Sequence, residues 1–175
     1  MAGQSNLSVV RDAVLEDLPA LTAIYNHYIV QTPITFDLRT YEPGERRAWF
    51  DEHGSSGRHR LLVAENDGQV VGYASASRWR PKAAYDTTVE SSVYCRKGAT
   101  GCGIGTQLYE ALFAAIADLD VHRIVAGVTL PNPASVALHQ RFGFRRVGVF
   151  TEAGRKFDKY WDVAWFQRPM VLSAP

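Results

Sequence analysis

Apolar residues recur at helical spacing in two long stretches of the chain and, over shorter lengths, in two more. These patterns predict helices that begin near residues 18, 43, 104 and 135 and end near residues 31, 53, 119 and 142. The first must end by Thr32-Pro33, because a proline disfavours helical backbone in the residue before it. The last is closed by Gly143, a residue type that commonly follows a helix.

β-Branched and aromatic residues concentrate in further runs, which predict the strands. The runs cover residues 8–11, 60–65, 69–77, 87–95, 123–130, 144–151 and 160–172. Asn66-Asp67-Gly68 is typical of a hairpin turn, and residues 34–36 suit a short extended piece. Residues 123–130 are apolar almost throughout, which indicates a strand in the interior of a sheet. Helices that interrupt the strands of one twisted sheet define a mixed α/β class.

The stretch from Val89 to Leu108 passes from a strand pattern through a glycine-dense turn into a helix pattern. Such a turn gathers free backbone N–H groups and the positive end of a helix dipole, which together can bind a phosphate. A Walker A loop is excluded, because Ile104-Gly105 stand where a lysine and a hydroxyl residue are required. A dinucleotide-binding turn is disfavoured, because the glycines follow a hairpin at mid-chain. A pyrophosphate seat and a tight connection without a ligand both remain.

Length and composition indicate one domain over residues 1–175, with residues 1–7 as a flexible tail. A net charge of +1 gives no electrostatic reason to expect nucleic acid or a membrane surface as a partner. The longest apolar runs are too short to span a bilayer, and no secretion signal is recognised. We expect Cys95 and Cys102 to be free thiols of a cytoplasmic protein. No spacing typical of a metal site is present, so we expect no metal.

Several motifs occur in a fixed order along nearly the whole chain. They are Val93-Tyr94-Cys95, then Gly101-Cys-Gly-Ile-Gly-Thr106, then Asn132-x-x-Ser135-x-x-Leu138-His139-x-x-Phe142-Gly143-Phe144. Together they resemble the GNAT acyl-CoA N-acyltransferases, and IYNHYI (24–29) and TVESSVY (88–94) are similar to the phosphinothricin and methionine sulfone/sulfoximine acetyltransferase branch. The resemblance implies a GNAT fold, a mixed, mostly antiparallel sheet of about seven strands, splayed in the middle and flanked by about four helices.

The resemblance also implies acetyl-CoA as the cosubstrate. Backbone groups of Val93, Tyr94 and Cys95 would pair with the pantetheine arm as if it were another strand. The residues that would cradle the pyrophosphate are Gly101, Cys102, Gly103, Ile104, Gly105 and Thr106. Asn132 would hydrogen-bond the pantetheine arm. Arg141 would lie near the coenzyme phosphates, although a solvated helix charge is the alternative.

Glu90 is the residue expected to accept the proton of the attacking amine, since a carboxylate in a partly dry pocket can act as a general base. The alternative is a solvent-facing glutamate on an edge strand. His139 stands where the wider superfamily often has the tyrosine that reprotonates the departing thiolate, and it could equally be an ordinary helix-face histidine. Thr100-Gly101 also departs from the usual start of the turn. An acyl-cysteine route through Cys95 or Cys102 is less favoured than direct transfer.

The loop after residue 78 is rich in cations and aromatic side chains. Arg80, Pro81, Lys82 and Ala83 are expected to bind the substrate carboxylate, with a basic solvent loop as the alternative. Phe36 and Tyr85 would form apolar walls, although Phe36 could instead plug the core.

Together these expectations describe an enzyme that transfers the acetyl group of acetyl-CoA to the α-amino group of a small, amino-acid-like substrate. Phosphinothricin, methionine sulfoximine and methionine sulfone are examples of such a substrate. Acetylation of a protein N-terminus or lysine and a non-catalytic coenzyme-A sensor are the alternatives; the presence of Glu90 disfavours the sensor. The aromatic segment FDKYWDVAWFQRPM (157–170) is expected to form a homodimer interface.

Overall fold

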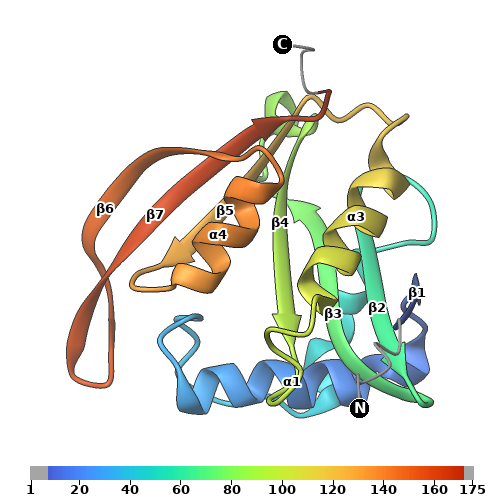
Figure 1. Cartoon of the computed structure of the whole chain (residues 1–175), viewed down its shortest axis with the longest axis horizontal. Coiled ribbons are helices and arrows are strands. Elements are labelled where there is room, and N and C mark those ends of the chain that lie inside the picture. The colour runs from blue at the N-terminus through green and yellow to red at the C-terminus, as the bar shows by residue number, and fades with distance from the viewer. Residues whose placement is uncertain (1–7, 172–175) are drawn as a thin grey trace, which may run out of the picture.

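The computed structural model of the chain describes residues 8–171 and contains one seven-stranded sheet with helices on both faces (Figure 1). The strands are β1 (Val9–Asp12), β2 (Arg60–Asn66), β3 (Gln69–Arg78), β4 (Thr88–Cys95), β5 (Arg123–Thr129), β6 (Arg145–Lys156) and β7 (Lys159–Pro169). The α-helices are α1 (Leu18–Gln31), α2 (Arg47–Asp51), α3 (Ile104–Ile116) and α4 (Pro133–Arg141). Three short 3₁₀ helices are η1 (Leu15–Asp17), η2 (Pro43–Arg46) and η3 (Ala83–Tyr85).

The strand order is β1-β2-β3-β4-β5-β7-β6, and every neighbouring pair is antiparallel except β4 and β5. That parallel pair is short, because it extends only from Thr88 opposite Arg123 to Glu90 opposite Val125. Beyond it the two strands diverge, as Figure 1 shows, while β4 continues to Cys95. The predicted splay in the middle of the sheet is therefore confirmed, and it leaves one side of β4 without a neighbouring strand.

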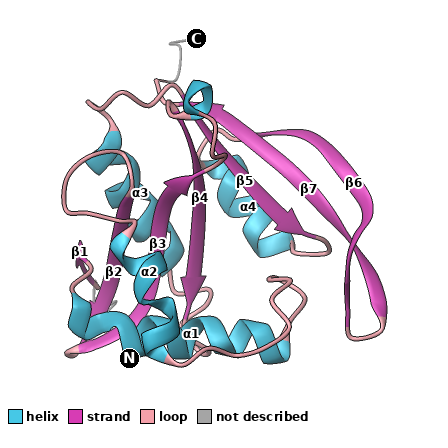
Figure 2. Ribbon diagram, turned by 180° about the vertical axis from the view of Figure 1, so that it is seen from behind, coloured by secondary structure: helices cyan, strands magenta, loops and turns pink. Residues whose placement is uncertain are grey.

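Two apolar cores hold the helices against the sheet. On one face Leu108, Leu112 and Ile116 of α3 are fully buried over β2, β3 and β4, and α4 lies on the same face. On the other face Leu21 and Ile24 of α1 pack in a smaller cluster with β2 and β3. Figure 2, seen from behind, shows α2 in front of this second face, with α1 across the end of the strands.

The hairpin turn is as predicted, and several predicted limits are corrected. Asp67 and Gly68 both have positive φ (49° and 73°), as a two-residue turn between β2 and β3 requires. The predicted helix over 43–53 is instead η2 followed by the short α2. The helix that was expected to reach 119 ends at Ile116, and the one expected at 135 begins at Pro133. The strand expected over 144–151 extends to Lys156 as β6, and the last strand, expected over 160–172, begins at Lys159 and ends at Pro169. The expectation for residues 1–7 lies outside the described residues.

The extended piece predicted at residues 34–36 is wrong, since this segment is a bend between α1 and η2. Side chains rather than a strand partner hold it. The hydroxyl of Tyr25 lies 2.7 Å from Oγ1 of Thr35, and Nζ of Lys156 donates to the carbonyl of Thr35 over 2.7 Å. The bend is thereby tied to both α1 and β6.

Candidate active site

The splay exposes the backbone of β4 to a small cavity of about 50 Å³. The N–H of Arg96 donates to the carbonyl of Val71, so the alternation of an antiparallel ladder turns the backbone of Ser92 and Tyr94 toward β3. The backbone of Ser91 and Val93 must therefore point into the splay. The expected pairing with a pantetheine arm fits Val93, whereas the backbone of Tyr94 belongs to the sheet.

Cys95 is the last residue of β4 and lies at the end of this open edge. Its carbonyl accepts a hydrogen bond of 2.8 Å from the Tyr28 hydroxyl, so that acceptor is already occupied. Burial raises the pKa of the Cys95 thiol to about 11, which leaves little thiolate at neutral pH. Cys102 is exposed in the glycine turn. An acyl-cysteine route through Cys95 is disfavoured by this environment.

The glycine turn leads into the N-terminus of α3. Gly98, Gly101 and Gly103 have φ of 84°, 79° and 81°, a region that other residues rarely adopt. Gly103 is the N-cap, and no side chain caps this helix. The first backbone N–H groups of α3, which include those of Ile104 and Thr106, are consequently free for an anion.

Gly105 has a different role from the other glycines of the turn. A Cβ at this position would lie 3.3 Å from Leu138 Cδ2 and 3.9 Å from Val93. Glycine therefore allows α3 to approach α4 closely.

Gly101 and Cys102 are exposed at the outer edge of the turn, and Arg141 is exposed at the end of α4.

His139 is 3% exposed and lines the small cavity together with Tyr109. Nδ1 of His139 lies 2.7 Å from the carbonyl of Ser135, and Nε2 lies 3.1 Å from the Tyr109 hydroxyl. Burial lowers the pKa of His139 and raises that of Tyr109, so both groups are neutral at pH 7. The Tyr109 hydroxyl also lies 3.3 Å from Oγ of Ser91 on the open strand.

Asn132, expected to contact the coenzyme, accepts a hydrogen bond of 3.1 Å from the N–H of Ser135 and so caps α4.

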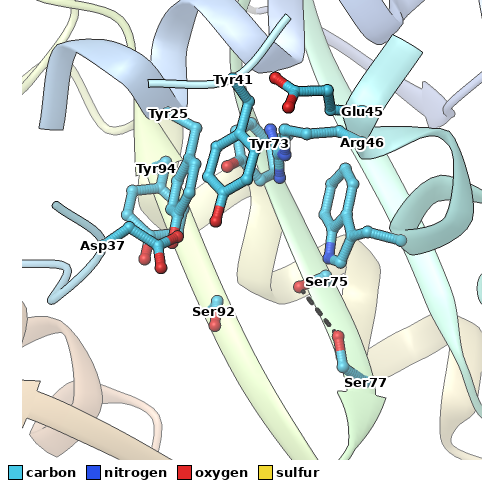
Figure 3. Close-up of a pocket in the computed structure, with 11 residues that line it drawn as sticks. Tyr25, Asp37, Tyr41, Glu45, Arg46, Tyr73, Ser75, Ser77, Ser92 and Tyr94 are labelled. Carbon is cyan, nitrogen blue, oxygen red and sulfur yellow. Dashed lines mark hydrogen bonds between the residues drawn. The ribbon is translucent and has the colours of Figure 1, made fainter. Parts of the chain in front are cut away.

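A larger cavity of about 270 Å³ opens on the other face of β3 and β4 (Figure 3). It is lined by Tyr25, Asp37, Tyr41, Glu45, Arg46, Trp49, Tyr73, Ser75, Ser77, Ser92 and Tyr94. Ser92 and Tyr94 line both cavities, so the two cavities flank β4. Of these residues, only Tyr94 was predicted from the sequence as a site residue.

Glu90 stands on the same face of β4 as Ser92 and Tyr94, because successive side chains alternate along a strand. It pairs across the β3–β4 ladder with Ser77, which lines the larger cavity. Burial raises the pKa of Glu90, and the charge of Arg80 partly offsets that rise. The alternative of a solvent-facing glutamate on an edge strand is wrong, since β4 is an interior strand and Glu90 is half-buried.

The predicted substrate loop lies outside the walls of the larger cavity. Arg80, Pro81, Lys82, Ala83 and Tyr85 are exposed, and the Arg80 guanidinium carbon lies 4.7 Å from the centroid of the Trp79 ring. The expected lining of the larger cavity by this loop is therefore not found, and the charge of Arg80 reaches Glu90 only as a small lowering of the pKa of that carboxyl.

Phe36 is half-buried and lies against Gly154 of β6, so closely that a Cβ on Gly154 would overlap its ring. It neither lines the larger cavity nor belongs to the buried core. Phe36 instead joins the bend after α1 to the β6–β7 hairpin.

The comparisons with known proteins agree with this architecture. The family model described as "Acetyltransferase (GNAT) family" matches residues 21–144. The chain is 52% identical over 163 residues to a phosphinothricin N-acetyltransferase of Streptomyces coelicolor, covering 92% of this chain and 95% of the relative. It is 37% identical over 158 residues to an L-methionine sulfoximine/L-methionine sulfone acetyltransferase of Pseudomonas paraeruginosa, covering 90% of this chain and 92% of the relative.

The fold has close counterparts among solved structures. One is a GNAT superfamily phosphinothricin acetyltransferase from Sinorhizobium meliloti in complex with acetyl-CoA, with a TM-score of 0.88 and 32% identity, covering 93% of this chain and 88% of that one. The chain therefore belongs to the GNAT acetyltransferase family, and the family and fold expected from the sequence motifs are confirmed.

Two further observations concern the part of the chain that the structure describes. None of its helices is long and apolar enough to cross a membrane. In residues 8–171, no group of three or more His, Cys, Asp or Glu side chains is arranged so as to hold a metal ion.

Proposed function

We propose that this protein transfers the acetyl group of acetyl-CoA to the α-amino group of a small amino acid or amino-acid analogue. The observation that carries the proposal is that two cavities share Ser92 and Tyr94 of β4. One lies along the open backbone of this strand, and the other is lined by Ser77, the cross-strand partner of Glu90. A thioester and an amine that enter from opposite faces would meet there. The relatives named for phosphinothricin and for methionine sulfoximine or sulfone support a substrate of this size.

In the proposed reaction the free N–H groups at the start of α3 bind the coenzyme pyrophosphate, and the backbone of Val93 pairs with the pantetheine arm. Glu90 accepts the proton that the ammonium group must lose before it can attack. Its raised pKa brings it nearer to the working pH of a base. Arg80 and Lys82 remain the proposed partners of the substrate carboxylate.

The departing thiolate needs a proton to become coenzyme A. His139 was expected to supply it, but its Nδ1–H is committed to the Ser135 carbonyl, and its Nε2 faces the Tyr109 hydroxyl. We therefore assign the donation to Tyr109, which lines the coenzyme cavity and whose hydroxyl proton would turn from Nε2 of His139 or Oγ of Ser91 to the thiolate. His139 then positions the tyrosine. The nitrogen loses a second proton as the amide forms, and this proton restores the Tyr109 hydroxyl. The proton taken by Glu90 passes to solvent, so the transfer releases a single proton per turnover.

A homodimer and a cytoplasmic location complete the proposal. β6 is an edge strand, and it carries Val147, Val149 and Phe150 exposed to solvent, followed by exposed Phe157 and Tyr160 in the hairpin to β7. An apolar edge of this kind suits a second copy of the chain. Light scattering at micromolar concentration should give the mass of a dimer, and a monomer would contradict this part of the proposal. Free Cys95 and Cys102 fit a reducing compartment.

The experiment that tests the function is thiol release from acetyl-CoA with a panel of amines. The panel contains the common amino acids, phosphinothricin, methionine sulfone, methionine sulfoximine and a lysine peptide. Turnover on a small amino acid or analogue supports the proposal, whereas turnover on the peptide alone would favour a protein acetyltransferase. Tight binding of acetyl-CoA without turnover on any amine would favour a sensor.

A further inference from the structure

His53 is a half-buried histidine that the reaction described above does not use. Its Nδ1 lies 2.8 Å from the carbonyl oxygen of Trp49, and its Nε2 lies 2.9 Å from Oγ of Ser77. A carbonyl can only accept, so Nδ1 carries a proton. Burial lowers the pKa of His53, and the imidazole is therefore neutral at pH 7, with a lone pair on Nε2.

The end of α2 holds the His53 ring in place. The helix ends at Asp51, two residues before His53. The last carbonyls of a helix lack partners within it, and Nδ1 of His53 donates to one of them, that of Trp49. The His53 ring also lies edge-on to the Trp49 ring, with 5.3 Å between the ring centroids. These two contacts fix which ring nitrogen faces β3.

This tautomer of His53 fixes the direction of the Ser77 hydroxyl. Nε2 can only accept, so the hydroxyl proton of Ser77 points to His53. Oγ of Ser75 lies 3.4 Å from Oγ of Ser77 (Figure 3), which is a longer and weaker contact. A hydroxyl has one proton and two lone pairs. With its proton directed to His53, Ser77 presents only lone pairs to its other neighbours.

Ser77 lies where the proposed reaction has use for such an acceptor. It lines the larger cavity and pairs across the β3–β4 ladder with Glu90. Residues that pair in this way have their side chains on one face of the sheet, with Cβ atoms about 4.5–5.5 Å apart. An amino group that gives a proton to the Glu90 carboxylate can therefore also reach Oγ of Ser77.

We propose that Ser77 accepts a hydrogen bond from the amino group of the substrate, and that His53 positions Ser77 for this contact by accepting its hydroxyl proton. This inference rests on the proposed function. Once the ammonium has given a proton to Glu90, the amine has one lone pair for the thioester and two N–H groups. An acceptor for one of these N–H groups restricts rotation about the C–N bond and directs the lone pair at the thioester carbon. Orientation of this kind lowers the barrier to attack.

Steady-state kinetics test this proposal with the amino acid or analogue that the wild type acetylates fastest in the amine panel. Ser77→Ala and His53→Met should each lower kcat/KM for that amine about tenfold, as expected for the loss of one hydrogen bond to the amino group. His53→Gln should stay within about threefold of the wild type, because its amide oxygen can accept the Ser77 proton. The KM for acetyl-CoA should stay unchanged in all three variants.

Gln and Met at position 53 form a matched pair. Their side chains are similar in size, and both lose the hydrogen bond to the Trp49 carbonyl, so any loss of stability from that bond is common to the two variants. His59→Gln is the control, because His59 lines a cavity of about 350 Å³ with His53 and Ser77 but forms no hydrogen bond to Ser77 in the described part of the chain. It should keep wild-type kinetics.

The double variant Ser77→Ala/His53→Met separates positioning from a purely structural role. If His53 acts through Ser77, the double variant should lose no more kcat/KM than Ser77→Ala alone. Additive losses, equal losses in His53→Gln and His53→Met, or wild-type kcat/KM in Ser77→Ala would overturn the proposal and leave the proposed function standing. A wild type that acetylates no amine of the panel would overturn the proposed function, and this inference with it.

Discussion

The hydroxyl of Tyr109 lies 3.1 Å from Nε2 of His139 inside the cavity beside β4. The other ring nitrogen of His139 lies 2.7 Å from the carbonyl of Ser135, which can only accept. The proton of the neutral imidazole is therefore on Nδ1, and Nε2 is the acceptor of the pair. Nε2 of His139 therefore has no proton to give. The single hydroxyl proton of Tyr109 is directed to Nε2 or to Oγ of Ser91, and in the proposed reaction it leaves that bond to reach the thiolate.

Tyr109→Phe should lower kcat by about 100-fold, the lower end of typical contributions from a general acid or base. It also leaves Nε2 of His139 without its partner, which should cost about 1–3 kcal/mol of unfolding free energy. Steady-state kinetics together with chemical denaturation separate the two effects. Tyr160→Phe makes the same chemical change on β7, outside the linings of both cavities, and serves as the control for catalysis. A Tyr109→Phe enzyme with full kcat would show that another group, or water, supplies the proton.

Glu90→Gln should stabilise the protein at pH 7.5. Because burial raises the folded-state pKa of Glu90, the ionised carboxylate destabilises the fold. This penalty appears as the pH rises from the unfolded pKa of about 4.3 through the higher folded pKa, and it is absent at lower pH. The melting temperature of the variant should therefore exceed that of the wild type at pH 7.5 and match it near pH 4. Glu110→Gln, at an exposed position on α3, is the matched control for the same chemical change.

Gly103→Ala should weaken acetyl-CoA binding. Gly103 has φ of 81° at the N-cap of α3, and a residue with a Cβ resists that conformation by roughly 1–2 kcal/mol. The strain displaces the free N–H groups that are proposed to hold the pyrophosphate, so the KM for acetyl-CoA should rise more than the KM for the amine. Gly148→Ala on β6 has open space around the added Cβ and should leave both values unchanged. Equal KM values for Gly103→Ala and wild type would argue against this phosphate seat.

Gly154→Ala should destabilise the contact between the β6–β7 hairpin and the bend after α1. The added Cβ would overlap the Phe36 ring, and forced overpacking typically costs about 1–3 kcal/mol. Phe36→Leu in the same chain should recover part of the loss by freeing space. A thermal denaturation series over the single and double variants measures the coupling. Additive effects of the two substitutions would mean that the hairpin does not depend on this contact.

Much of the fold was predictable because it follows from local signals. The glycine turn between β4 and α3, the Asp67-Gly68 hairpin and the apolar run of β5 each specify their own conformation. The bend at residues 34–36 was not predictable in this way, because the Lys156 and Tyr25 side chains that hold it come from β6 and α1.

The site was predictable only in part. Glu90 and Val93 were predicted through motif resemblance, and the structure places both on β4 beside the splay. Tyr109 was overlooked because it lies on the buried apolar side of α3, where a tyrosine resembles a core residue. The alternation of Tyr73, Ser75 and Ser77 along β3 was the available signal for the larger cavity. Arg46 gave no such signal, since its burial depends on rings from α1 and α2.

The most direct test of the proposed chemistry is the pH profile of kcat/KM for methionine sulfone in wild type and Glu90→Gln, with acetyl-CoA binding measured in parallel. The wild-type rate should fall as the pH drops through a value above the ordinary glutamate pKa, because the base must be ionised. The variant should bind acetyl-CoA normally but lose about 100-fold or more in kcat/KM, and with it the acidic limb set by Glu90. Wild-type activity and an unchanged pH profile in Glu90→Gln would contradict the assignment of Glu90 as the base.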